Sequence, residues 1–486
     1  MKLFSSQEVF CNLVPMRTYA IYCGGQFIET NESLLIKNKF SGKNYAKTFL
    51  ANRIILEKAI KHAQLALEPC KSLSSFEKRK ALTFISQQIE KNKNRLAELL
   101  CIESAKPIRY AIVEIERAAE TFQIAAEECQ RLPKEFMSLD RRENAKGKFG
   151  LVNYFPIGIV AGISPFNFPL NLAVHKIAPA IASGCPIILK PSSLTPLSTL
   201  ELAKIISHTD LPLGAVSILP MNRSVGNSLV EDERINMLSF TGSPEVGWNL
   251  KRQSGKKKVV LELGGNAGVI ISDNVEVQGI VAKCIQGAFA YSGQICIHAQ
   301  RFFVHENQFE KFSKLMMSAV KKLKCGNPLL AEIDISNLID EKNAIRIEEW
   351  VNEAKQQGAK ILCGGKRKGT FYAPTILTNT KTNMKVNAEE VFGPVVCIEK
   401  YSGSIKNAIN MINDSKYGLQ CGVFTDSIEE LDAVFQSAEV GGVLHNQVPT
   451  VRYDEMPYGG IKESGLGREG VRYAIADMLE PKILIK

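Results

Sequence analysis

The sequence lacks several features that would assign a protein to a class at once. No apolar run approaches the roughly 18–20 residues that a membrane-spanning helix needs, and the densest apolar stretch, residues 157–163, is bounded by Pro156 and Pro165. None of the twelve cysteines forms a C-x-x-C pair, which excludes a zinc ribbon or a thioredoxin-type motif. The six histidines include no i, i+4 pair, so the sequence gives no support for a catalytic metal.

Charge and composition exclude further classes. Lysine and arginine outnumber aspartate and glutamate by 60 to 50, but the basic residues are scattered, which argues against a nucleic-acid partner. With 45% apolar residues and widely spaced cysteines, we expect a globular, cytoplasmic protein without a membrane association. Residues 1–15 have no cationic segment before an apolar core and are a poor secretory signal, and Met16 is an alternative to Met1 as the true start.

The spacing of apolar residues changes along the chain. Residues 54–128 carry apolar side chains at helical spacing, and the polar, glycine-containing stretch 139–153 predicts a hairpin that leaves the main body. Strand-like and helical segments then alternate at 157–271 and 275–443, which predicts an α/β fold with two parallel sheets. The apolar run 482–486 predicts a terminal strand, and a neighbouring subunit is its expected pairing partner. The strand-like runs of the first region lie at 157–163, 187–189, 216–219, 237–241, 259–263 and 268–271.

Polar residues follow several of these predicted strands, at the edge where open α/β sheets bind ligands. Asn167 is flanked by aromatic residues and prolines; its amide could donate to a developing oxyanion, or it could simply satisfy a local turn. Lys190 could bind ribose hydroxyls or a phosphate, or be an ordinary surface lysine. The turn at 241–247 opens a helix and could hold a pyrophosphate, although the same residues also cap helices.

Three residues are candidates for nucleophilic or acid–base chemistry. Cys296 follows Ser-Gly-Gln-Ile in a predicted loop after a long helix, where a thiol near backbone N–H groups could act as a nucleophile. Glu262 stands among apolar residues of a predicted strand; burial would raise its pKa and suit a general base, whereas alternation would turn it toward solvent. His298, two residues after Cys296, is a further base candidate and ranks below Glu262.

The pattern Gly465-x-Gly467-x-x-Gly470 matches the fingerprint of dinucleotide-binding folds. No strand is predicted before it, and only sixteen residues follow it, which leaves no room for a strand–helix–strand unit. We therefore interpret this segment as a glycine-rich loop.

Seven short motifs occur in the order and spacing of the aldehyde dehydrogenase superfamily, which the chain resembles from about residue 19 to its C-terminus. The resemblance implies that Cys296 attacks an aldehyde to form a thiohemiacetal, while Asn167 and the backbone N–H of Cys296 hold the oxyanion. It further implies that hydride passes to NAD or NADP and that Glu262 activates the water that hydrolyses the thioester. The motifs are Phe166-Asn167-Phe168-Pro169, Lys190-Pro191-Ser192, Phe240-Thr241-Gly242-Ser243, Leu261-Glu262-Leu263-Gly264-Gly265, Gly293-Gln294-Ile295-Cys296, Glu390-Val391-Phe392-Gly393-Pro394 and Pro457-Tyr458-Gly459-Gly460-Ile461-Lys462.

The resemblance also implies an organisation for the chain. We expect a cofactor-binding α/β domain at 18–133 and 152–263, a catalytic α/β domain at 264–456, and a small β oligomerisation flap at 134–151 and 474–486. A homodimer or homotetramer, a small aldehyde substrate and no metal are expected. The residues similar to the family's cofactor ligands are Lys190, Ser193, Gly226, Gly242, Ser243, Gly264, Glu390 and Phe392.

Two features bear on specificity. Many NAD-preferring members carry a glutamate three residues after the strand-end lysine, where this sequence has Ser193; a hydroxyl would not repel a 2′-phosphate, so NADP should be tolerated. Residues 446–458 are similar to the branch that acts on small oxygenated or anionic aldehydes, such as lactaldehyde, phosphonoacetaldehyde, sulfolactaldehyde and glyceraldehyde 3-phosphate. Arg452 could pair with an acidic substrate group or form a structural salt bridge, and Arg117 is a second candidate.

Three alternatives stay open at this level. An acylating, coenzyme-A-dependent member would pass the acyl group to a thiol, but such branches commonly lack the glutamate present here as Glu262. A non-catalytic protein that keeps the fold is disfavoured because Cys296, Glu262 and Asn167 are all retained. A cysteine hydrolase with His298 as its base would need no cofactor.

Overall fold

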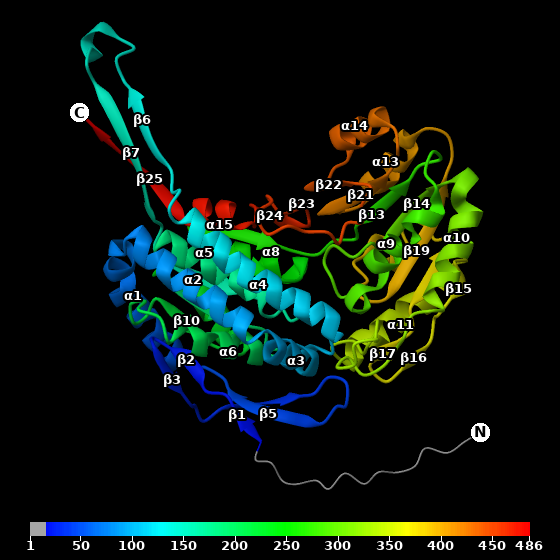
Figure 1. The fold of residues 1–486 in the computed structure, drawn as a ribbon, viewed down its shortest axis with the longest axis horizontal. Coiled ribbons are helices and arrows are strands. Elements are labelled where there is room, and N and C mark those ends of the chain that lie inside the picture. Colours follow the sequence, from blue (N-terminus) through cyan, green and yellow to red (C-terminus); the bar gives the residue numbers. More distant parts are fainter. Residues whose placement is uncertain (1–15) are drawn as a thin grey trace.

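A computed structural model describes residues 16–486 (Figure 1). Residues 1–15, on which the prediction of a poor secretory signal and the candidate start at Met1 fall, lie outside the described residues. Two large sheets with their helices occupy opposite sides of the molecule, and a long hairpin projects from one of them (Figure 1).

The first sheet has eight strands in the order β24-β12-β11-β8-β9-β10-β2-β3. Its five central strands are parallel, as the alternating sequence predicts, and antiparallel strands close both edges. Side chains alternate between its faces, so that Val160 packs into one apolar core and Ile159 and Ala161 into the other. The strands are β24 (Gly465–Leu466), β12 (Lys258–Glu262), β11 (Ile235–Thr241), β8 (Ile159–Ile163), β9 (Ile187–Lys190), β10 (Val216–Ile218), β2 (Ile21–Cys23) and β3 (Gln26–Ile28).

Helices cover both faces of this sheet. One core is formed with α2 (Ser75–Lys91), α3 (Lys93–Ser104), α4 (Ile108–Glu128), α5 (Asn171–Ser183) and α6 (Leu197–Ile206), and the other with α1 (Arg53–Ser72), α7 (Arg223–Glu231) and α8 (Pro244–Gln253). Helix α5 is buried along its whole length, because it packs between β8 and β9 on one side and α4 on the other. Its first turn, which follows Asn167 in the chain, is therefore held on several sides.

The second sheet has seven strands in the order β15-β18-β19-β14-β13-β21-β22, all parallel except β15. Helices α9 (Val277–Phe289) and α10 (Glu306–Val320) cover one face, while α11 (Glu341–Gln356), α13 (Ile405–Asn413) and α14 (Ile428–Ser437) pack into two further cores. The short helix α12 (Lys385–Ala388) precedes β19. The strands are β15 (Lys360–Cys363), β18 (Thr375–Thr378), β19 (Val395–Tyr401), β14 (Arg301–His305), β13 (Gly268–Ile271), β21 (Gln420–Phe424) and β22 (Gly442–His445).

The projecting hairpin is part of a three-stranded antiparallel sheet in the order β25-β7-β6. β6 (Lys134–Ser138) and β7 (Phe149–Pro156) form the hairpin that the sequence predicts, and β25 (Leu479–Ile485) pairs with β7 along its whole length. The chain itself thus supplies the partner of one edge of the terminal strand, and pairing of its other edge with a neighbouring subunit stays a prediction. Apolar side chains stay at the surface of this flap, among them Phe136, which is 70% exposed, and Leu484, which is 53% exposed.

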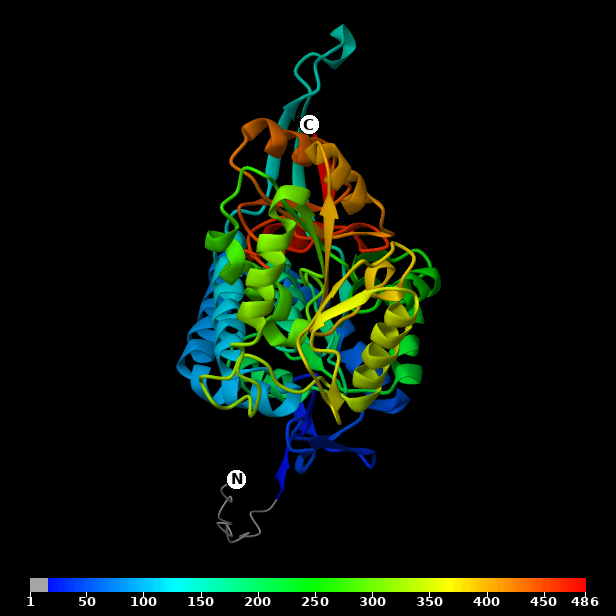
Figure 2. The same cartoon turned by 90° about the vertical axis from the view of Figure 1, so that its right-hand side faces the viewer.

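Smaller sheets complete the fold. β1 (Arg17–Thr18), β5 (Asn44–Phe49) and β4 (Ser33–Lys37) form a sheet at the end of the molecule opposite the hairpin, as Figure 2 shows. Two two-stranded sheets pair β16 (Arg367–Lys368) with β17 (Phe371–Tyr372) and β20 (Tyr417–Gly418) with β23 (Ile461–Lys462).

The G-x-G-x-x-G pattern at 465–470 begins inside β24, and β23 stands just before it. The prediction that no strand precedes this pattern was therefore wrong. β24 nevertheless runs antiparallel to β12, and the helix that follows, α15 (Val471–Asp477), leads to β25 of another sheet. The segment is thus a tight loop at a sheet edge and not a strand–helix–strand unit.

The predicted fold class, α/β with two largely parallel sheets and a small β flap, is confirmed. The predicted domain boundaries stay predictions; the chain leaves the first sheet after Glu262 and enters the second at Gly268. Across residues 16–486, no helix combines the length and the apolar character needed to span a bilayer. The same residues contain no cluster of three histidine, cysteine or acidic side chains arranged to hold a metal ion.

Candidate active site

A cavity of about 660 Å³ lies at the carboxyl edge of the first sheet and is closed by residues of the second half of the chain. The loops after β8, β9 and β11 contribute Asn167, Ser193 and Ser243, and the facing wall contributes Cys296 and Glu390. This edge is where parallel α/β sheets bind ligands, because the loops there converge on one crevice.

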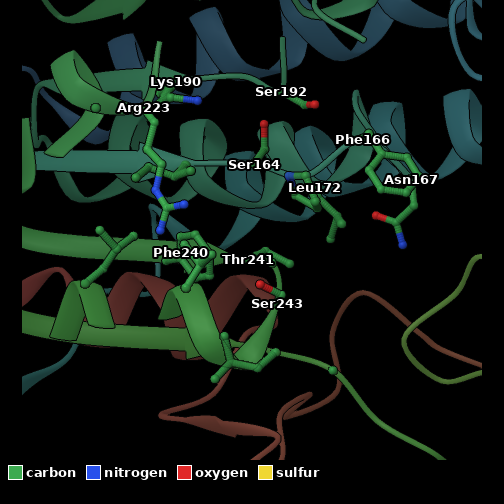
Figure 3. Close-up of a pocket in the computed structure, with 18 of the residues that line it drawn as sticks. Ser164, Phe166, Asn167, Leu172, Lys190, Ser192, Arg223, Phe240, Thr241 and Ser243 are labelled. Carbon is green, nitrogen blue, oxygen red and sulfur yellow. The ribbon is translucent and has the colours of Figure 1, made fainter. Parts of the chain in front are cut away.

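Every residue that the resemblance assigns to the cofactor lines this cavity. Figure 3 shows Lys190 and Arg223 at one end of the cavity and Phe166 and Asn167 at the other. Burial lowers the pKa of Lys190, and no carboxylate among the described residues opposes that shift. Arg223 was missed in the sequence, where the first residue of a helix looks like an ordinary surface position. The predicted residues are Lys190, Ser193, Gly226, Gly242, Ser243, Gly264, Glu390 and Phe392.

At the end of the cavity that holds Lys190 and Arg223, two glycines and the N-terminus of α8 leave room for a dinucleotide. A Cβ atom on Gly226 would lie 3.0 Å from Cε of Lys190, and one on Gly242 would lie 2.5 Å from the Phe240 ring. Ser243 is the N-cap of α8, but its side chain makes no capping hydrogen bond, so the first turn still offers N–H groups to an anion. Backbone and charge at this end therefore fit a pyrophosphate and its adenosine.

Glu390 stands on the facing wall near Cys296. Its Oε1 accepts a hydrogen bond of 2.9 Å from the backbone N–H of Gly265. Burial raises the pKa of Glu390 to about 7, while that hydrogen bond and the charge of Arg346 act in the opposite direction. A carboxyl group held in this way can accept hydrogen bonds from ribose hydroxyls. Phe392, two residues later, adopts a left-handed conformation with φ 50°.

A strained turn carries Cys296 into the cavity. The 3-10 turn η2 (Ala290–Gly293) follows α9, and Tyr291 and Ser292 have φ values of 48° and 54°. Each such non-glycine residue costs on the order of 1 kcal/mol or more, which packing elsewhere must offset. Gly293 is also left-handed, and a Cβ atom there would clash with the carbonyl group of Gly393.

Asn167 is joined to the Cys296 loop by its amide. Its Nδ2 donates to the carbonyl oxygen of Gln294 at 3.1 Å, and its Oδ1 accepts from the backbone N–H of Phe168 at 3.1 Å. The side chain is 3% exposed and lines the cavity. One N–H of the amide thus fixes its orientation, and the second can donate to an oxyanion beside Cys296.

The Sγ atom of Cys296 lies 3.1 Å from the hydroxyl oxygen of Tyr458. Burial raises the pKa of the Cys296 thiol to about 12; the hydrogen bond with Tyr458 lowers it and the charge of Glu390 raises it. Tyr458 belongs to a motif quoted above, but no role is predicted for it from the sequence. The available signal was a hydroxyl on an aromatic ring beside two glycines.

Glu262 ends β12 and is 3% exposed, so the alternative of a strand glutamate that faces solvent was wrong. Neither carboxyl oxygen has a hydrogen-bond partner in residues 16–486. Burial, and next the charge of Glu469, raise the pKa of Glu262 well above its usual value. The charge of Glu262 also raises the pKa of Cys296, so the carboxyl group and the sulfur lie within electrostatic reach of each other.

Arg452 and Arg117 belong to a largely buried ion network. Nη2 of Arg452 donates to Glu469 at 2.9 Å, and Arg117 donates to both oxygens of Asp454 at 2.6 and 3.1 Å. Nε2 of His175 lies 2.8 Å from the same aspartate. The alternative role of Arg452 as a structural salt bridge is therefore confirmed, and Arg117 forms one as well.

His298 is directed away from the sulfur. Its Nε2 lies 2.7 Å from the carbonyl oxygen of Ala288, and burial lowers its pKa to about 4. The hydrogen-bond partner of the Cys296 sulfur is Tyr458 and not this imidazole. The cysteine-hydrolase alternative thus loses the residue on which it depended.

Known proteins resemble this chain over nearly its whole length. Residues 27–484 match the aldehyde dehydrogenase family. The 3-sulfolactaldehyde dehydrogenase of Priestia aryabhattai is 38% identical over 475 residues, which cover 98% of this chain and 99% of that protein. Aldehyde dehydrogenase 21 from Physcomitrella patens, solved with its reaction product succinate, has a TM-score of 0.96 at 42% identity and covers 97% of this chain and 99% of its own.

The glyceraldehyde-3-phosphate dehydrogenase GapN from Methanocaldococcus jannaschii, solved with NADP, has a TM-score of 0.90 at 36% identity, with 94% of this chain and 99% of its own covered. The predicted family and activity are thereby confirmed, as is a nicotinamide cofactor. The chain belongs to the aldehyde dehydrogenase family and is an oxidoreductase that uses NAD or NADP.

Proposed function

We propose that this chain oxidises a small aldehyde carrying an anionic group to the corresponding carboxylate, with Cys296 as the nucleophile. One observation carries the proposal: Cys296 and Asn167 meet at one end of a cavity whose remaining walls fit a nicotinamide dinucleotide. The nucleophile, an oxyanion donor and the hydride acceptor are thus brought to one place.

The first half-reaction follows from this placement. The Cys296 thiol first gives its proton to solvent. The thiolate then adds to the aldehyde carbon, and the carbonyl electron pair moves to the oxygen, where Asn167 Nδ2 and the backbone N–H of Cys296 stabilise it. A nicotinamide cofactor held by the residues that line the cavity would supply the hydride acceptor. Loss of hydride from the carbon would let the oxygen electron pair re-form the carbonyl group, with an acyl thioester left on Cys296.

Glu262 completes the reaction as a general base. It takes a proton from a water molecule whose oxygen adds to the thioester carbon; the C–S bond then breaks and its electron pair returns to the sulfur. A carboxyl group with a raised pKa is matched to this task near neutral pH. A buried glutamate near the sulfur also supports hydrolysis over transfer to coenzyme A.

The cationic end of the cavity supports the use of NADP. Lys190 and Arg223 lie there, and Ser193 replaces the carboxylate that would repel a 2′-phosphate. Phosphate groups are bound well by such paired cations. We therefore expect NADP to be at least as good a cofactor as NAD.

Two arginines of a largely buried charged cluster support an anionic substrate. Arg117 has 21% of its side chain exposed and could pair with a substrate anion, as could Arg452. An anionic group is also common to 3-sulfolactaldehyde, succinate and glyceraldehyde 3-phosphate, the compounds named for the relatives above. The charged members of the cluster are Arg117, Lys176, Arg452, Asp454 and Glu469.

We also propose how the chain divides into domains. Residues 18–133 and 152–263 would form the cofactor-binding domain, 264–456 the catalytic domain, and 134–151 with 474–486 the flap. The exposed apolar side chains of the flap support a homodimer or homotetramer. The eleven described cysteines are all free thiols, which supports a reducing, cytoplasmic location.

The test is a matrix of aldehydes and cofactors. Succinic semialdehyde, sulfolactaldehyde and glyceraldehyde 3-phosphate are compared with neutral propanal and lactaldehyde, with NAD or NADP, with and without coenzyme A. We expect free acids without coenzyme A, higher kcat/KM for the anionic aldehydes, and no turnover in Cys296→Ala. Cys325→Ala, at an exposed cysteine, is the matched control and should retain activity. Turnover by Cys296→Ala, or a preference for neutral aldehydes, would contradict the proposal.

A further inference from the structure

We infer that Tyr458 is a catalytic residue whose hydroxyl donates a hydrogen bond to the Cys296 sulfur, both when the sulfur attacks and when it leaves. This inference rests on the proposed function, in which Cys296 is the nucleophile. It assigns a chemical role to a side chain that neither binds the cofactor nor accepts a proton from water.

The Tyr458 hydroxyl and the Cys296 sulfur are held in hydrogen-bond contact. The hydroxyl oxygen and Sγ are 3.1 Å apart, and Tyr458 is 2% exposed. The backbone of Tyr458 is held by paired hydrogen bonds with Glu469, one in each direction. Once Cys296 has lost its proton it can only accept, so the tyrosine must be the donor.

Tyr458 is also the only hydrogen-bond partner of that sulfur in the described residues. The turn before Cys296 is a four-residue 3-10 turn with left-handed residues, so no regular helix begins there to stabilise an anion. Burial works against the thiolate. A donor at 3.1 Å is therefore the main local compensation that the protein offers.

Arg452 strengthens this donor. Its guanidinium carbon lies 3.9 Å from the centroid of the Tyr458 ring, and the group is held there by a hydrogen bond of 2.9 Å to Glu469. A cation over the ring stabilises the negative charge that develops on the phenol oxygen as it gives up part of its proton. Burial raises the pKa of Tyr458 well above its usual value, so the hydroxyl keeps its proton and remains a donor.

The same bond serves the second half-reaction. When water has added to the thioester carbon and Glu262 holds the water's proton, the C–S bond breaks and its electron pair returns to the sulfur. The departing sulfur is again an anion at the place where the Tyr458 hydroxyl stands. One donor therefore lowers the barrier to attack and the barrier to release, since both steps pass through charge on the same atom.

The first test measures how the reactivity of the Cys296 sulfur depends on pH, in the enzyme without cofactor or substrate. The rate of Cys296 alkylation by iodoacetamide is followed from pH 6 to 11 by mass spectrometry. Other charges act on this sulfur, with Glu390 and Glu262 raising its pKa and Arg452 lowering it, but they are unchanged by Tyr458→Phe. We expect that variant to move the profile to higher pH and to lower the rate at pH 8 by roughly 10- to 100-fold.

Two further variants keep the test decisive. Tyr45→Phe, which removes a hydroxyl on β5 that accepts from Arg17, is the matched control and should leave the profile unchanged. 3-Fluorotyrosine placed at 458 keeps the ring and is a stronger donor, so it should move the profile to lower pH. An unchanged profile in both 458 variants would overturn the inference, and a variant that fails to fold leaves the other to decide.

The kinetic readout separates this inference from the proposed function. Tyr458→Phe should lower both the rate of the first-turnover burst of NADPH and the steady-state rate, because the sulfur attacks in the first step and leaves in the second. A decrease in only one of these two rates would contradict the inference that Tyr458 acts in both steps. If Cys296→Ala kept full dehydrogenase activity, the proposed function would fail, whereas the alkylation profiles would still report on the hydrogen bond itself.

Discussion

Lys106 and Glu114 form an ion pair in which neither side chain has any exposed surface. The ammonium group lies 3.8 Å from the ring centroid of Phe168 and 4.4 Å from that of Tyr291. Phe168 follows Asn167, the proposed oxyanion donor, and Tyr291 stands in the strained turn before Cys296. One buried cation therefore connects the two loops that carry the proposed catalytic groups.

Breaking this pair should destabilise the protein and the site together. Glu114 also accepts the backbone N–H groups of Leu170 and Asn171, at the start of α5. Glu114→Gln leaves the Lys106 charge without its partner, and we expect a loss of about 3–5 kcal/mol in the free energy of unfolding. Urea denaturation followed by circular dichroism measures this loss.

The control for that experiment is on the same helix. Glu116 pairs with Lys93 and is 47% exposed, so Glu116→Gln should change stability little. Equal losses in the two variants would show that the buried pair has no special role.

Ser193→Glu should weaken NADP use more than NAD use. The new carboxylate would repel a 2′-phosphate at the end of the cavity that holds Lys190 and Arg223. We expect the affinity for NADPH to fall by roughly 10- to 100-fold, with a smaller effect on NADH, as measured by fluorescence titration. Ser193→Gln adds similar bulk without charge and is the control; equal losses for both cofactors would refute the argument.

Glu262→Gln should stop the reaction after the first turnover. The amide cannot take a proton from water, so the hydride burst should survive while steady-state turnover falls by about 10²- to 10⁴-fold. In the wild-type enzyme, the hydrolytic step should slow as pH falls below the raised pKa of Glu262, because the protonated group is no longer a base. Rapid-quench mass spectrometry should detect the thioester on Cys296, and unchanged steady-state turnover would disprove the assignment.

The central strands of the first sheet were predictable from sequence, whereas its edges were not. The runs predicted at 187–189, 216–219 and 259–263 correspond to β9, β10 and β12, because parallel strands buried on both faces are continuously apolar. The edge pairing of β2 with β10 joins Tyr22 to Ile218, far apart in the chain. Such antiparallel pairs between distant segments leave no periodic pattern, which is also why β7 was not foreseen as the partner of β25.

In the candidate site too, some residues were predictable from the sequence and others were not. Cys296, Asn167 and Glu262 lie in short motifs whose spacing shows in the sequence. The contact of Tyr458 with the sulfur, and that of Arg117 with Asp454, join residues 162 and 337 positions apart. Their roles depend on which loops fold against each other, and a single sequence does not carry that information.

The ionised state of Asp454 should make stability depend on pH in the acid range. Burial opposes its charge, but the hydrogen bond and charge of His175, together with Arg117, hold the pKa of Asp454 well below its usual value. A carboxyl group whose pKa is depressed in the folded protein stabilises it above the unfolded pKa of about 3.9, and this contribution is lost as pH falls further. Asp454→Asn should therefore cost about 3–5 kcal/mol at pH 7, where it leaves Arg117 without its partner.

The difference between the wild-type protein and Asp454→Asn should shrink as the pH falls from 4 toward 2, because the Asp454 carboxyl group of the unfolded protein then takes up a proton while that of the folded protein stays charged. Urea denaturation at several pH values measures it. Asp210→Asn, which breaks the exposed pair with Lys80, should follow the wild-type curve closely. A difference between wild type and Asp454→Asn that stays constant down to pH 2 would show that the aspartate stabilises the network by its shape and hydrogen bonds and not by its charge.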